Sequence, residues 1–585
     1  MRNSRFRFDP APHLRELGAI ITEIQASEAL DAGALDRILR RHPKDGRGLF
    51  ARTEIVAATL HLARAGALPG DAESLVEKLR TCPTRTQSGV VPVTVLTRPH
   101  PCPGRCVFCP SDARMPKSYL AAEPGAQRAT AHRFDPYAQT WSRLDAYRRM
   151  GHRCDKAELI VLGGTWSHYP EAYRVWFVTR ALQALSDFGE GRDGRGSIEE
   201  EPDDFSSLPA VARGSYDRTV ARHLRERRAV REAASFEDLM GAQRRNEAAR
   251  VRCVGLSLET RPDALDEAEV VRLRRLGATK IQVGIQSLHD AVLLANRRGH
   301  DVAATRDALR HLRAAGMKIQ AHWMPNLLGA TPESDLDDFA RLFADRDFRP
   351  DELKLYPTSL VESAELVEHH RTGAWRPYDD AELLRVVTEC MRRTPRWCRL
   401  SRVVRDIPSP DIVVGNKRTN FREIAEADLR SRGVPLVEIR AREIGRGAWD
   451  PARVALRETE YATSVGRERF LEMLTPEDRL LAFLRLSLPA HASFVAELGT
   501  SAVIRELHVY GGVAGIGERV PGAPQHRGLG RALVSAARER AAAAGHATLA
   551  VISAVGTREY WRTLGFRDGD LYQHLPSRPS PISTI

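Results

Sequence analysis

Hydrophobic and polar positions along the middle of this chain predict strands and helices in alternation. Several short runs are apolar through most of their length, as is typical of parallel strands covered on both faces. These runs lie at residues 90–96, 157–164, 251–260, 278–287, 317–324, 352–357 and 400–407. Stretches with helical spacing separate most of them. The repetition predicts a parallel α/β sheet or barrel, with functional residues just past the carboxyl ends of the strands.

The two ends of the chain have different patterns. Apolar residues recur at helical spacing near the N-terminus, for example at Leu14, Leu17, Ile20, Ile21 and Ile24. We expect a helical region there, which either contacts RNA or caps the next domain. After about residue 435, a strand–loop–helix–strand–helix series predicts a separate C-terminal α/β domain.

These patterns divide the chain into an expected set of domains. A polar, Gly-rich and charged stretch interrupts the predicted barrel and is interpreted as an insertion or mobile lid, with the chemistry elsewhere. The expected parts are a helical N-terminal region at 1–80, a barrel at 81–410 with the insertion at about 187–250, a linker at 411–440 and the C-terminal domain at 441–585.

Charge and composition narrow the class of protein. The 585 residues include 88 Lys and Arg against 76 Asp and Glu, a formal net charge of +12. This favours a polyanionic partner, nucleic acid first, although an Arg-rich soluble protein fits as well. The eight cysteines are too few for a disulfide scaffold and fit a reducing cytosol. No secretory signal and no apolar run of about 18 residues is present, so we expect a cytoplasmic protein with no membrane contact.

The segment CPGRCVFC carries the strongest chemical signal. It places Cys102, Cys106 and Cys109 at the spacing C-x3-C-x2-C, just after the first predicted strand. Three thiolates can bind three irons of a 4Fe-4S cluster and leave the fourth open, as radical S-adenosylmethionine (SAM) enzymes require. A structural zinc site is the alternative, but it normally has four protein ligands and the chain has no second C-x2-C pair.

Polar residues follow several predicted strands in turn. Gly163, Gly164 and Thr165 end one strand, and a glycine pair permits close approach of the backbone to a ligand such as SAM. Glu259 ends the next strand and could bind a ribose hydroxyl, or only pair with a cation. Later strand ends carry Gln286, His322, Asn326, Lys354 and Tyr356. This recurrence indicates one site assembled from many strands.

A second motif lies in the predicted C-terminal domain. Gln525, Gly528 and Gly530 form Q-x-x-G-x-G at the start of an Ala-rich helix, where backbone N–H groups can bind a pyrophosphate. The flanking strand RELHV and the later YWRTLGF make the region resemble the acetyl-CoA site of GNAT acetyltransferases. Trp561 stands where that fold often has a Tyr general acid. Either Tyr560 is the acid, or the domain binds acetyl-CoA without completing a routine acetyl transfer.

Two basic stretches are candidate RNA-binding surfaces. Phe134, Tyr137, Trp141 and Tyr147 lie among the first group of cations, as expected if bases stack between them. A solvated helix face is the alternative reading of either stretch. The candidate contacts are Arg128, Arg133, Arg143, Arg148, Arg149, Arg402 and Arg405.

In its ordered motifs the chain resembles the catalytic subunit of Elongator, in a single-chain prokaryotic form. The resemblance runs from about residue 75 to 575 and includes CPGRCVFC, GHRCDKAELIVLGGTW, SLETRPD, VGIQS, NRRGH, ELKLYP, RDIPSP, RELHVYGG, PQHRGLG and GTREYWRTLGF. It implies a partial parallel (β/α) radical SAM barrel followed by a GNAT-type α/β acetyltransferase domain, with a helical N-terminal region. Asn326 departs from the family, which has Asp after Met-Pro.

The resemblance also implies a reaction and its cofactors. It implies synthesis of 5-carboxymethyluridine at the tRNA wobble position, in which a SAM-derived radical takes hydrogen from acetyl-CoA. Lys156 would act with Tyr560 on the thioester of acetyl-CoA. The thioester would reach from the GNAT domain into the barrel mouth. The acetyl-CoA contacts would be Lys156, Glu506, Leu507, His508, Val509, Pro524, Gln525, His526, Gly528, Gly530, Tyr560 and Trp561, and the SAM contacts Gly163, Gly164, Thr165, Glu259 and Gln286.

Two other classes of function remain open on the sequence alone. The first is a protein lysine acetyltransferase with a structural cluster, and the second is a non-catalytic RNA-binding scaffold. By the resemblance, accessory subunits are not required, and a homodimer is left open.

Overall fold

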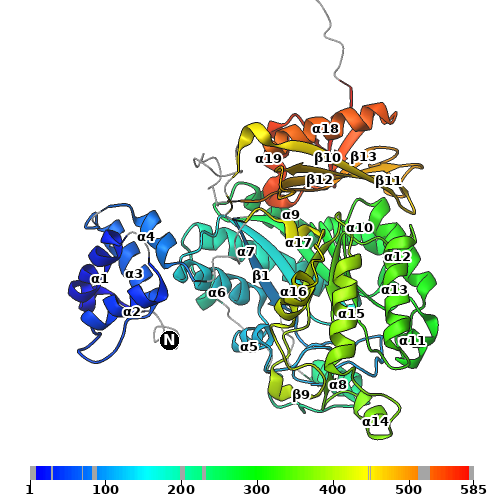
Figure 1. Cartoon of the computed structure of the whole chain (residues 1–585), viewed down its shortest axis with the longest axis horizontal. Coiled ribbons are helices and arrows are strands. Elements are labelled where there is room, and N and C mark those ends of the chain that lie inside the picture. The colour runs from blue at the N-terminus through cyan, green and yellow to red at the C-terminus, as the bar shows by residue number, and fades with distance from the viewer. Residues whose placement is uncertain are drawn as a thin grey trace, which may run out of the picture.

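The structure is a computed structural model of the chain. It describes residues 8–27, 30–68, 70–81, 89–197, 204–226, 232–445, 447, 449–511 and 528–578. Figure 1 shows a small helical lobe at the N-terminal end, a large central α/β part, and a second sheet with its own helices packed against the central part.

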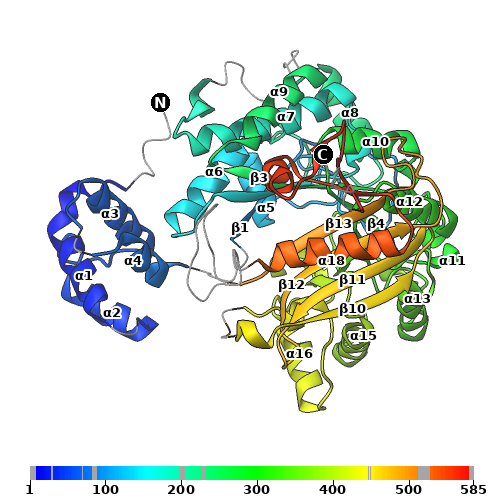
Figure 2. The same cartoon turned by 90° about the horizontal axis from the view of Figure 1, so that it is seen from above.

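The N-terminal lobe is a small helical bundle, as predicted. Its helices are α1 (Leu14–Ala26), α2 (Ala32–Arg41), α3 (Arg52–Arg64) and α4 (Ala72–Leu79). The apolar positions recognised in the sequence form a core of their own, which includes Leu17, Ile20, Ile21, Ile24, Ile55 and Leu75. The lobe stands to one side of the central part in both views (Figures 1 and 2).

The central part is built on a seven-stranded sheet in which every neighbouring pair of strands is parallel. Its strands, in spatial order, are β1 (Val90–Leu96), β2 (Lys156–Leu162), β3 (Arg252–Thr260), β4 (Lys280–Gln286), β5 (Lys318–Trp323), β6 (Glu352–Leu355) and β8 (Arg399–Val403). Helices cover its outer face (Figure 1). They include α6 (Pro136–Arg149), α7 (Glu171–Gly189), α10 (Glu267–Arg275), α12 (Val302–Ala314), α13 (Pro332–Ala344) and α15 (Asp380–Arg393). The partial parallel barrel is confirmed.

Alternate residues of each strand face opposite sides of the sheet. In β1, Val91, Val93 and Val95 belong to the core beneath the helices, whereas Val90, Pro92 and Thr94 line an internal cavity. The strands were predicted to be buried on both faces. The structure instead gives them one apolar face and one face on a partly polar lumen, because the barrel is wide enough to be hollow.

The C-terminal part is a second seven-stranded sheet, of order β10-β11-β12-β13-β14-β16-β15. Its strands are β10 (Ala455–Ala462), β11 (Gly466–Leu474), β12 (Leu480–Pro489), β13 (Ala502–Val509), β14 (Thr548–Val551), β15 (Arg567–Asp568) and β16 (Gln573–Pro576). Only β13 and β14 pair in parallel; the other pairs are antiparallel. The helices α18 (Leu529–Ala543) and α19 (Arg558–Thr563) follow β13 and β14 in the chain.

The two sheets meet at the amino-terminal ends of the barrel strands. The Tyr572 hydroxyl donates a hydrogen bond to the carbonyl of Ala315, 2.8 Å away, just before β5. The Arg274 guanidinium, just before β4, donates to the carbonyl of Leu571 at 2.9 Å. Val503 and Tyr572 of the C-terminal part belong to the same hydrophobic core as the barrel. One continuous core therefore joins the two parts.

Residues 411–440, expected as a linker, are structured. They contain β9 (Ile412–Val414), which pairs with β7 (Leu360–Val361), and the helices α16 (Phe421–Ser431) and α17 (Ile439–Arg442). Phe421, Ala425 and Leu429 pack into the barrel core. Among the described residues, no helix has the length and apolar character that crossing a membrane requires.

Candidate functional site

The three cysteines of the CPGRCVFC segment lie in the loop that follows β1, at the carboxyl end of the strand, as predicted. Cys106 and Cys109 are buried, and each thiol perturbs the pKa of the other. The thiol of Cys109 also lies 3.0 Å from the hydroxyl of Ser118, and that of Cys102 lies 3.5 Å from the hydroxyl of Thr165. The loop that follows β2 thus reaches the cysteine loop.

Two arginines make the cysteine loop electropositive, and sequence reasoning assigned neither of them a role. Arg298 Nη1 donates a hydrogen bond to Cys106 Sγ at 3.1 Å, and Arg261 Nη1 donates at 3.9 Å. The hydrogen bond with Cys109 lowers the pKa of Cys106 well below its usual value, and both arginines act in the same direction against the effect of burial. Burial raises the pKa of Cys102. The signal that could have identified Arg298 is the motif NRRGH, in which it lies.

The donor set fits an iron–sulfur cluster better than a single metal ion. Among the described residues, no three His, Cys, Asp or Glu side chains converge closely enough to hold one ion. Cysteine thiolates are the usual ligands of 4Fe-4S clusters, in which each cysteine binds a different iron. Thiolate chemistry and nearby cations both suit an anionic cluster.

The glycine pair after β2 forms a tight turn beside the cysteine loop. Gly163 and Gly164 have φ values of +131° and +67°, which side chains other than glycine rarely adopt. A Cβ atom at Gly163 would overlap the hydroxyl of Thr97. A side chain is therefore excluded here, and the Gly163 carbonyl accepts hydrogen bonds from the hydroxyls of Thr97 and Tyr169, each at 3.2 Å.

Glu259 and Gln286 end β3 and β4 on the lumen side of the cysteine loop. Glu259 accepts a hydrogen bond from the Tyr119 hydroxyl at 3.0 Å and lies 3.7 Å from His322 Nδ1. Gln286 has a left-handed φ of +66°, and its Oε1 atom is buried with no hydrogen-bond partner in the described structure. Buried polar groups normally have partners. An unpartnered oxygen at the carboxyl end of β4 is consistent with a group that a bound molecule satisfies.

A cavity of about 1780 Å³ runs from the barrel lumen to the C-terminal sheet. Its barrel lining includes Lys156 and Glu158 of β2, Gln282 of β4 and Lys354 of β6. Its lining from the C-terminal part comprises residues 505–510 of β13 and the turn after it, the start of α18, and Tyr560 and Trp561 of α19.

The C-terminal side of the cavity has an open strand edge. β13 pairs with β14 only as far as Ile504, which lies opposite Val551. A register shift opposite Arg485 and Leu486 leaves Arg505 as an extra residue, and the strand bends there. The residues Glu506, Leu507, His508 and Val509 lie beyond this bend and line the cavity, where sequence reasoning expects an acyl-pantetheine arm.

The predicted pyrophosphate loop is described only in part. Pro524, Gln525 and His526 lie outside the described residues. Gly528, with φ of +87°, caps the start of α18, so the helix N-terminus faces the cavity. A Cβ atom on Gly530 would lie 2.8 Å from the Tyr560 hydroxyl, so a side chain there would require Tyr560 to shift.

The two aromatic residues of α19 have different environments. Tyr560 is 42% exposed and lines the cavity, whereas Trp561 is buried in the C-terminal core and packs edge-on against Phe566. Burial of the hydroxyl end raises the pKa of Tyr560, so the phenol stays protonated at neutral pH. Of the two, Tyr560 alone has a hydroxyl to donate.

Lys156 lies at the first position of β2, at the end of the barrel opposite to the cysteine loop. The sequence-based expectation that the thioester enters at the barrel mouth is therefore corrected: the C-terminal part meets the barrel at the strand starts, and Lys156 lines the cavity there. Burial lowers the pKa of Lys156, which favours the neutral amine more than at the surface.

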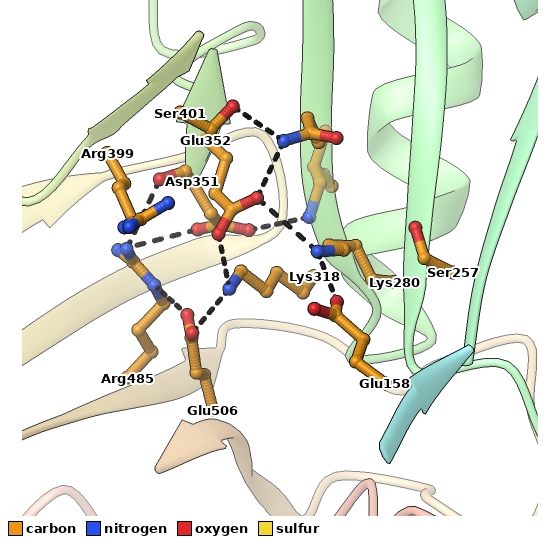
Figure 3. A network of polar contacts seen from close by, with 12 residues as sticks. Glu158, Ser257, Lys280, Lys318, Asp351, Glu352, Arg399, Ser401, Arg485 and Glu506 are labelled. Atoms are coloured by element: carbon orange, nitrogen blue, oxygen red, sulfur yellow. Dashed lines mark hydrogen bonds and ion pairs between the residues drawn. The ribbon is translucent and has the colours of Figure 1, made fainter. Parts of the chain in front are cut away.

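A buried network of charges joins the barrel to β13 (Figure 3). Lys318 Nζ lies 2.7 Å from Glu352 Oε1 and also pairs with Glu506. Glu506 accepts a second hydrogen bond from Arg485 at 2.8 Å, and Lys280 pairs with Glu158 at 2.5 Å. Burial opposes ionisation of Glu352, but the nearby lysines outweigh it and lower the pKa of its carboxyl well below the usual value.

The structure contradicts part of the prediction made for the basic stretches. Tyr137, Trp141 and Tyr147 are buried core residues, not stacking platforms, because α6 packs on the barrel sheet; Phe134, just before α6, is buried in a separate cluster. That part of the prediction was wrong.

Most of the candidate arginines have partners within the protein. Arg143 donates to the Tyr147 hydroxyl at 2.8 Å, and Arg148 and Arg149 both pair with Asp145. Arg402 pairs with Asp406, and Arg405 pairs with Glu123 at 2.7 Å inside the barrel end. Arg133 is exposed and Arg128 is half-buried. Their contact with RNA stays a prediction.

Comparison with known proteins bears on both halves of the chain. Residues 350–431 match the profile of the Radical SAM C-terminal domain. A tRNA uridine(34) acetyltransferase of Methanocaldococcus infernus is 33% identical over 91% of this chain and 96% of its own length. The human Elongator complex protein 3 is 33% identical over 84% of this chain and 85% of its own length.

The chain belongs to the Elongator complex protein 3 family. A solved structure agrees: the archaeal Methanocaldococcus infernus Elp3, with an N-terminal deletion of residues 1–46, superposes with a TM-score of 0.67 and 31% identity, covering 84% of this chain and 99% of that one. The fold class inferred from the sequence is thereby confirmed, and so is the Elongator complex protein 3 resemblance.

One departure from the Elongator complex protein 3 pattern has a structural explanation. Asn326 adopts a left-handed φ of +64°, which asparagine tolerates better than most residues. Its Oδ1 atom accepts from the Tyr378 N–H at 2.9 Å, and its Nδ2 donates to the Arg376 carbonyl at 3.1 Å. The amide therefore holds the loop after β5 in place.

Proposed function

We propose that this chain forms 5-carboxymethyluridine at the wobble position of tRNA, as a radical SAM enzyme that uses acetyl-CoA. The proposal rests on family membership and on one observation above all. A single cavity is lined at one end by the open edge of β13 and the start of α18, and it extends through the barrel strands toward the end that carries the cysteine loop. One cavity can therefore bring the two cofactor chemistries to one substrate.

At the carboxyl end of the barrel, Cys102, Cys106 and Cys109 would hold the 4Fe-4S cluster. When bound, the cluster supplies the electron that cleaves SAM and starts radical chemistry. Gly163, Gly164 and Thr165 would expose their backbone to SAM, with Glu259 and Gln286 as polar contacts. Arg298 and Arg261 stabilise the negative charge of the thiolates.

At the other end, the chain would bind acetyl-CoA along Glu506–Val509 and at Gly528 and Gly530, with Pro524–His526 leading into that turn. The dipole of α18 favours pyrophosphate at its N-terminus. Tyr560 would donate a proton at the thioester. Lys156 would position the acyl group where it enters the lumen.

The remaining features of the proposal concern the context of the enzyme. The basic balance of the chain suits tRNA as its substrate. We propose that it acts in the cytoplasm, without accessory subunits and as a monomer or homodimer. We also retain the domain limits inferred from the sequence, with the barrel at 81–410 and the GNAT-like domain at 441–585.

The decisive test is an anaerobic assay. The protein is reconstituted with iron and sulfide and incubated with SAM, a reductant, acetyl-CoA and unmodified tRNA. The tRNA is then digested for nucleoside mass spectrometry. We expect 5-carboxymethyluridine that depends on both SAM and acetyl-CoA. No modified uridine from a chain with an intact cluster, together with acetylated lysine in a protein partner, would favour a lysine acetyltransferase instead.

Salt dependence tests the RNA surface. Phosphate contacts release counterions, so the logarithm of the tRNA affinity should fall linearly with the logarithm of salt concentration, with a slope of about −0.7 per contact on a single strand. Arg133→Ala, an exposed site, should make the slope shallower by about one such contact. Filter binding or fluorescence anisotropy at several salt concentrations measures this. A flat response would contradict the proposed surface.

A further inference from the structure

The inserted segment covers the cysteine loop. Sequence analysis placed the chemistry elsewhere, but residues 204–226 form backbone hydrogen bonds with the chain just after the cysteines. The Ala212 N–H donates to the Ser111 carbonyl at 2.8 Å, and the Ala113 N–H donates to the Pro209 carbonyl at 3.0 Å. The Tyr216 hydroxyl donates to the Met115 carbonyl at 2.8 Å. We call residues 204–226 the cover segment.

Side-chain packing fixes the cover segment in place. Ala212, Tyr216 and Val220 form a buried cluster with Ala113 of the cysteine loop's continuation. On the outer side, Arg213 pairs with Glu362 at 2.9 Å and with Glu368 at 3.1 Å. Apolar contacts on one side and ion pairs on the other therefore fix the cover segment to the barrel end.

One contact reaches a candidate cluster ligand directly. Asp217, in the first turn of α8 (Tyr216–Glu226), accepts a hydrogen bond from the backbone N–H of Cys102; Oδ1 lies 2.9 Å from that nitrogen. Among the described residues, this carboxylate forms no ion pair, so the Cys102 N–H is its partner there. Cys102 is also the one of the three cysteines that is only half-buried.

A second contact anchors the start of the same loop. Arg98, four positions before Cys102, pairs with Glu232 at 2.8 Å, and its guanidinium lies 4.6 Å from the centre of the Tyr173 ring. Glu232 lies beyond α8 in the same insertion. The chain that leads into the cysteine loop is thus held at Arg98 and at Cys102 by two carboxylates from one inserted stretch.

We propose that Asp217 is a positioning residue for the iron–sulfur site. It fixes the backbone of Cys102 and places a negative charge beside the cluster. The inference rests on the proposed function, since it requires that Cys102 binds iron. Second-sphere groups of this kind orient metal ligands and tune the metal they hold.

Two roles of the carboxylate can be separated by substitution. Asp217→Asn keeps an oxygen that can accept from the Cys102 N–H but removes the charge. Asp217→Ala removes both. A negative charge near a cluster disfavours the added electron, so both substitutions should raise the reduction potential of the cluster. Only the alanine variant should loosen Cys102, because it alone loses the hydrogen bond to the Cys102 N–H.

The experiment uses the full chain reconstituted anaerobically with iron and sulfide. Loss of the cluster to a chelator is followed by visible absorbance, and the reduction potential by electron paramagnetic resonance in a redox titration. We expect Asp217→Ala to lose iron about tenfold faster than the wild type. We expect Asp217→Asn to lose it at close to the wild-type rate but to be reduced at a higher potential.

The matched control is Asp204→Asn, which removes a carboxylate from the same cover segment. Asp204 bonds locally with the backbone of Ser206, so both readouts should stay at the wild-type values. Equal iron loss and equal potential for wild type, Asp217→Asn and Asp217→Ala would overturn the inference. If the alanine variant does not fold, the potential of the asparagine variant decides. A wild-type chain that binds no cluster would instead refute the proposed function.

Discussion

Replacing Cys106 by alanine is expected to abolish formation of the modified uridine while tRNA binding persists. Cys106 accepts hydrogen bonds from two arginines and lies at the centre of the cysteine loop. Because substitution of an outer-sphere partner alone typically costs a metal site about 10–100-fold in affinity or activity, loss of a ligand should exceed about 100-fold. Iron content measures the loss of the cluster, and mass spectrometry of the nucleosides measures the loss of the modified uridine.

The control for this substitution is Cys154→Ala. Cys154 is a buried cysteine outside the motif, whose thiol donates to the Leu144 carbonyl at 3.6 Å. Its loss should leave product formation close to the wild-type rate. Wild-type yields of modified uridine from the Cys106→Ala chain would exclude a radical role for the loop.

Replacing Lys318 by methionine should strongly destabilise the chain. The substitution leaves the carboxylates of Glu352 and Glu506 buried without their shared cation (Figure 3). Breaking a buried ion pair by removing one partner typically costs about 3–5 kcal/mol. Urea denaturation measures the effect: we expect a lower midpoint for the transition that unfolds both sheets. Affinity for acetyl-CoA should fall as well, since Glu506 begins the open part of β13.

A double variant and an exposed pair sharpen this prediction. In Lys318→Met combined with Glu506→Gln, one of the two carboxylates that lose Lys318 is neutral, so the combined loss should be smaller than the sum of the single losses. The exposed pair of Arg385 and Glu333 serves as the control, because Arg385→Met should cost at most about 1 kcal/mol. Additive losses at Lys318 and Glu506 would show that the two side chains are not coupled.

Much of the fold could be predicted because its signals are local. The apolar strand runs, the helical spacing near Leu17 and Ile21, and the cysteine spacing each depend on residues close together in sequence. The glycine turn at Gly163 was also predictable, since two glycines after a buried strand favour a close backbone approach. Family motifs then linked these local signals to one another.

What the sequence could not supply were long-range relations. Nothing in the periodicity indicates at which end of the barrel the second sheet docks, and the thioester was therefore expected at the barrel mouth, the end opposite to Lys156. The aromatic residues near Trp141 were assigned to RNA because amphipathic burial on a neighbouring sheet cannot be seen in a basic stretch. Asp217 was missed because the bond to Cys102 spans 115 positions in the chain.

The docking of the second sheet at the strand starts has a consequence for the order of events in catalysis. On the proposed assignment, the acyl donor enters the lumen from one end and the anticodon meets the cysteine loop at the other. Neither substrate has to pass the other to reach its place or to leave. On this assignment we expect the enzyme to bind them in either order.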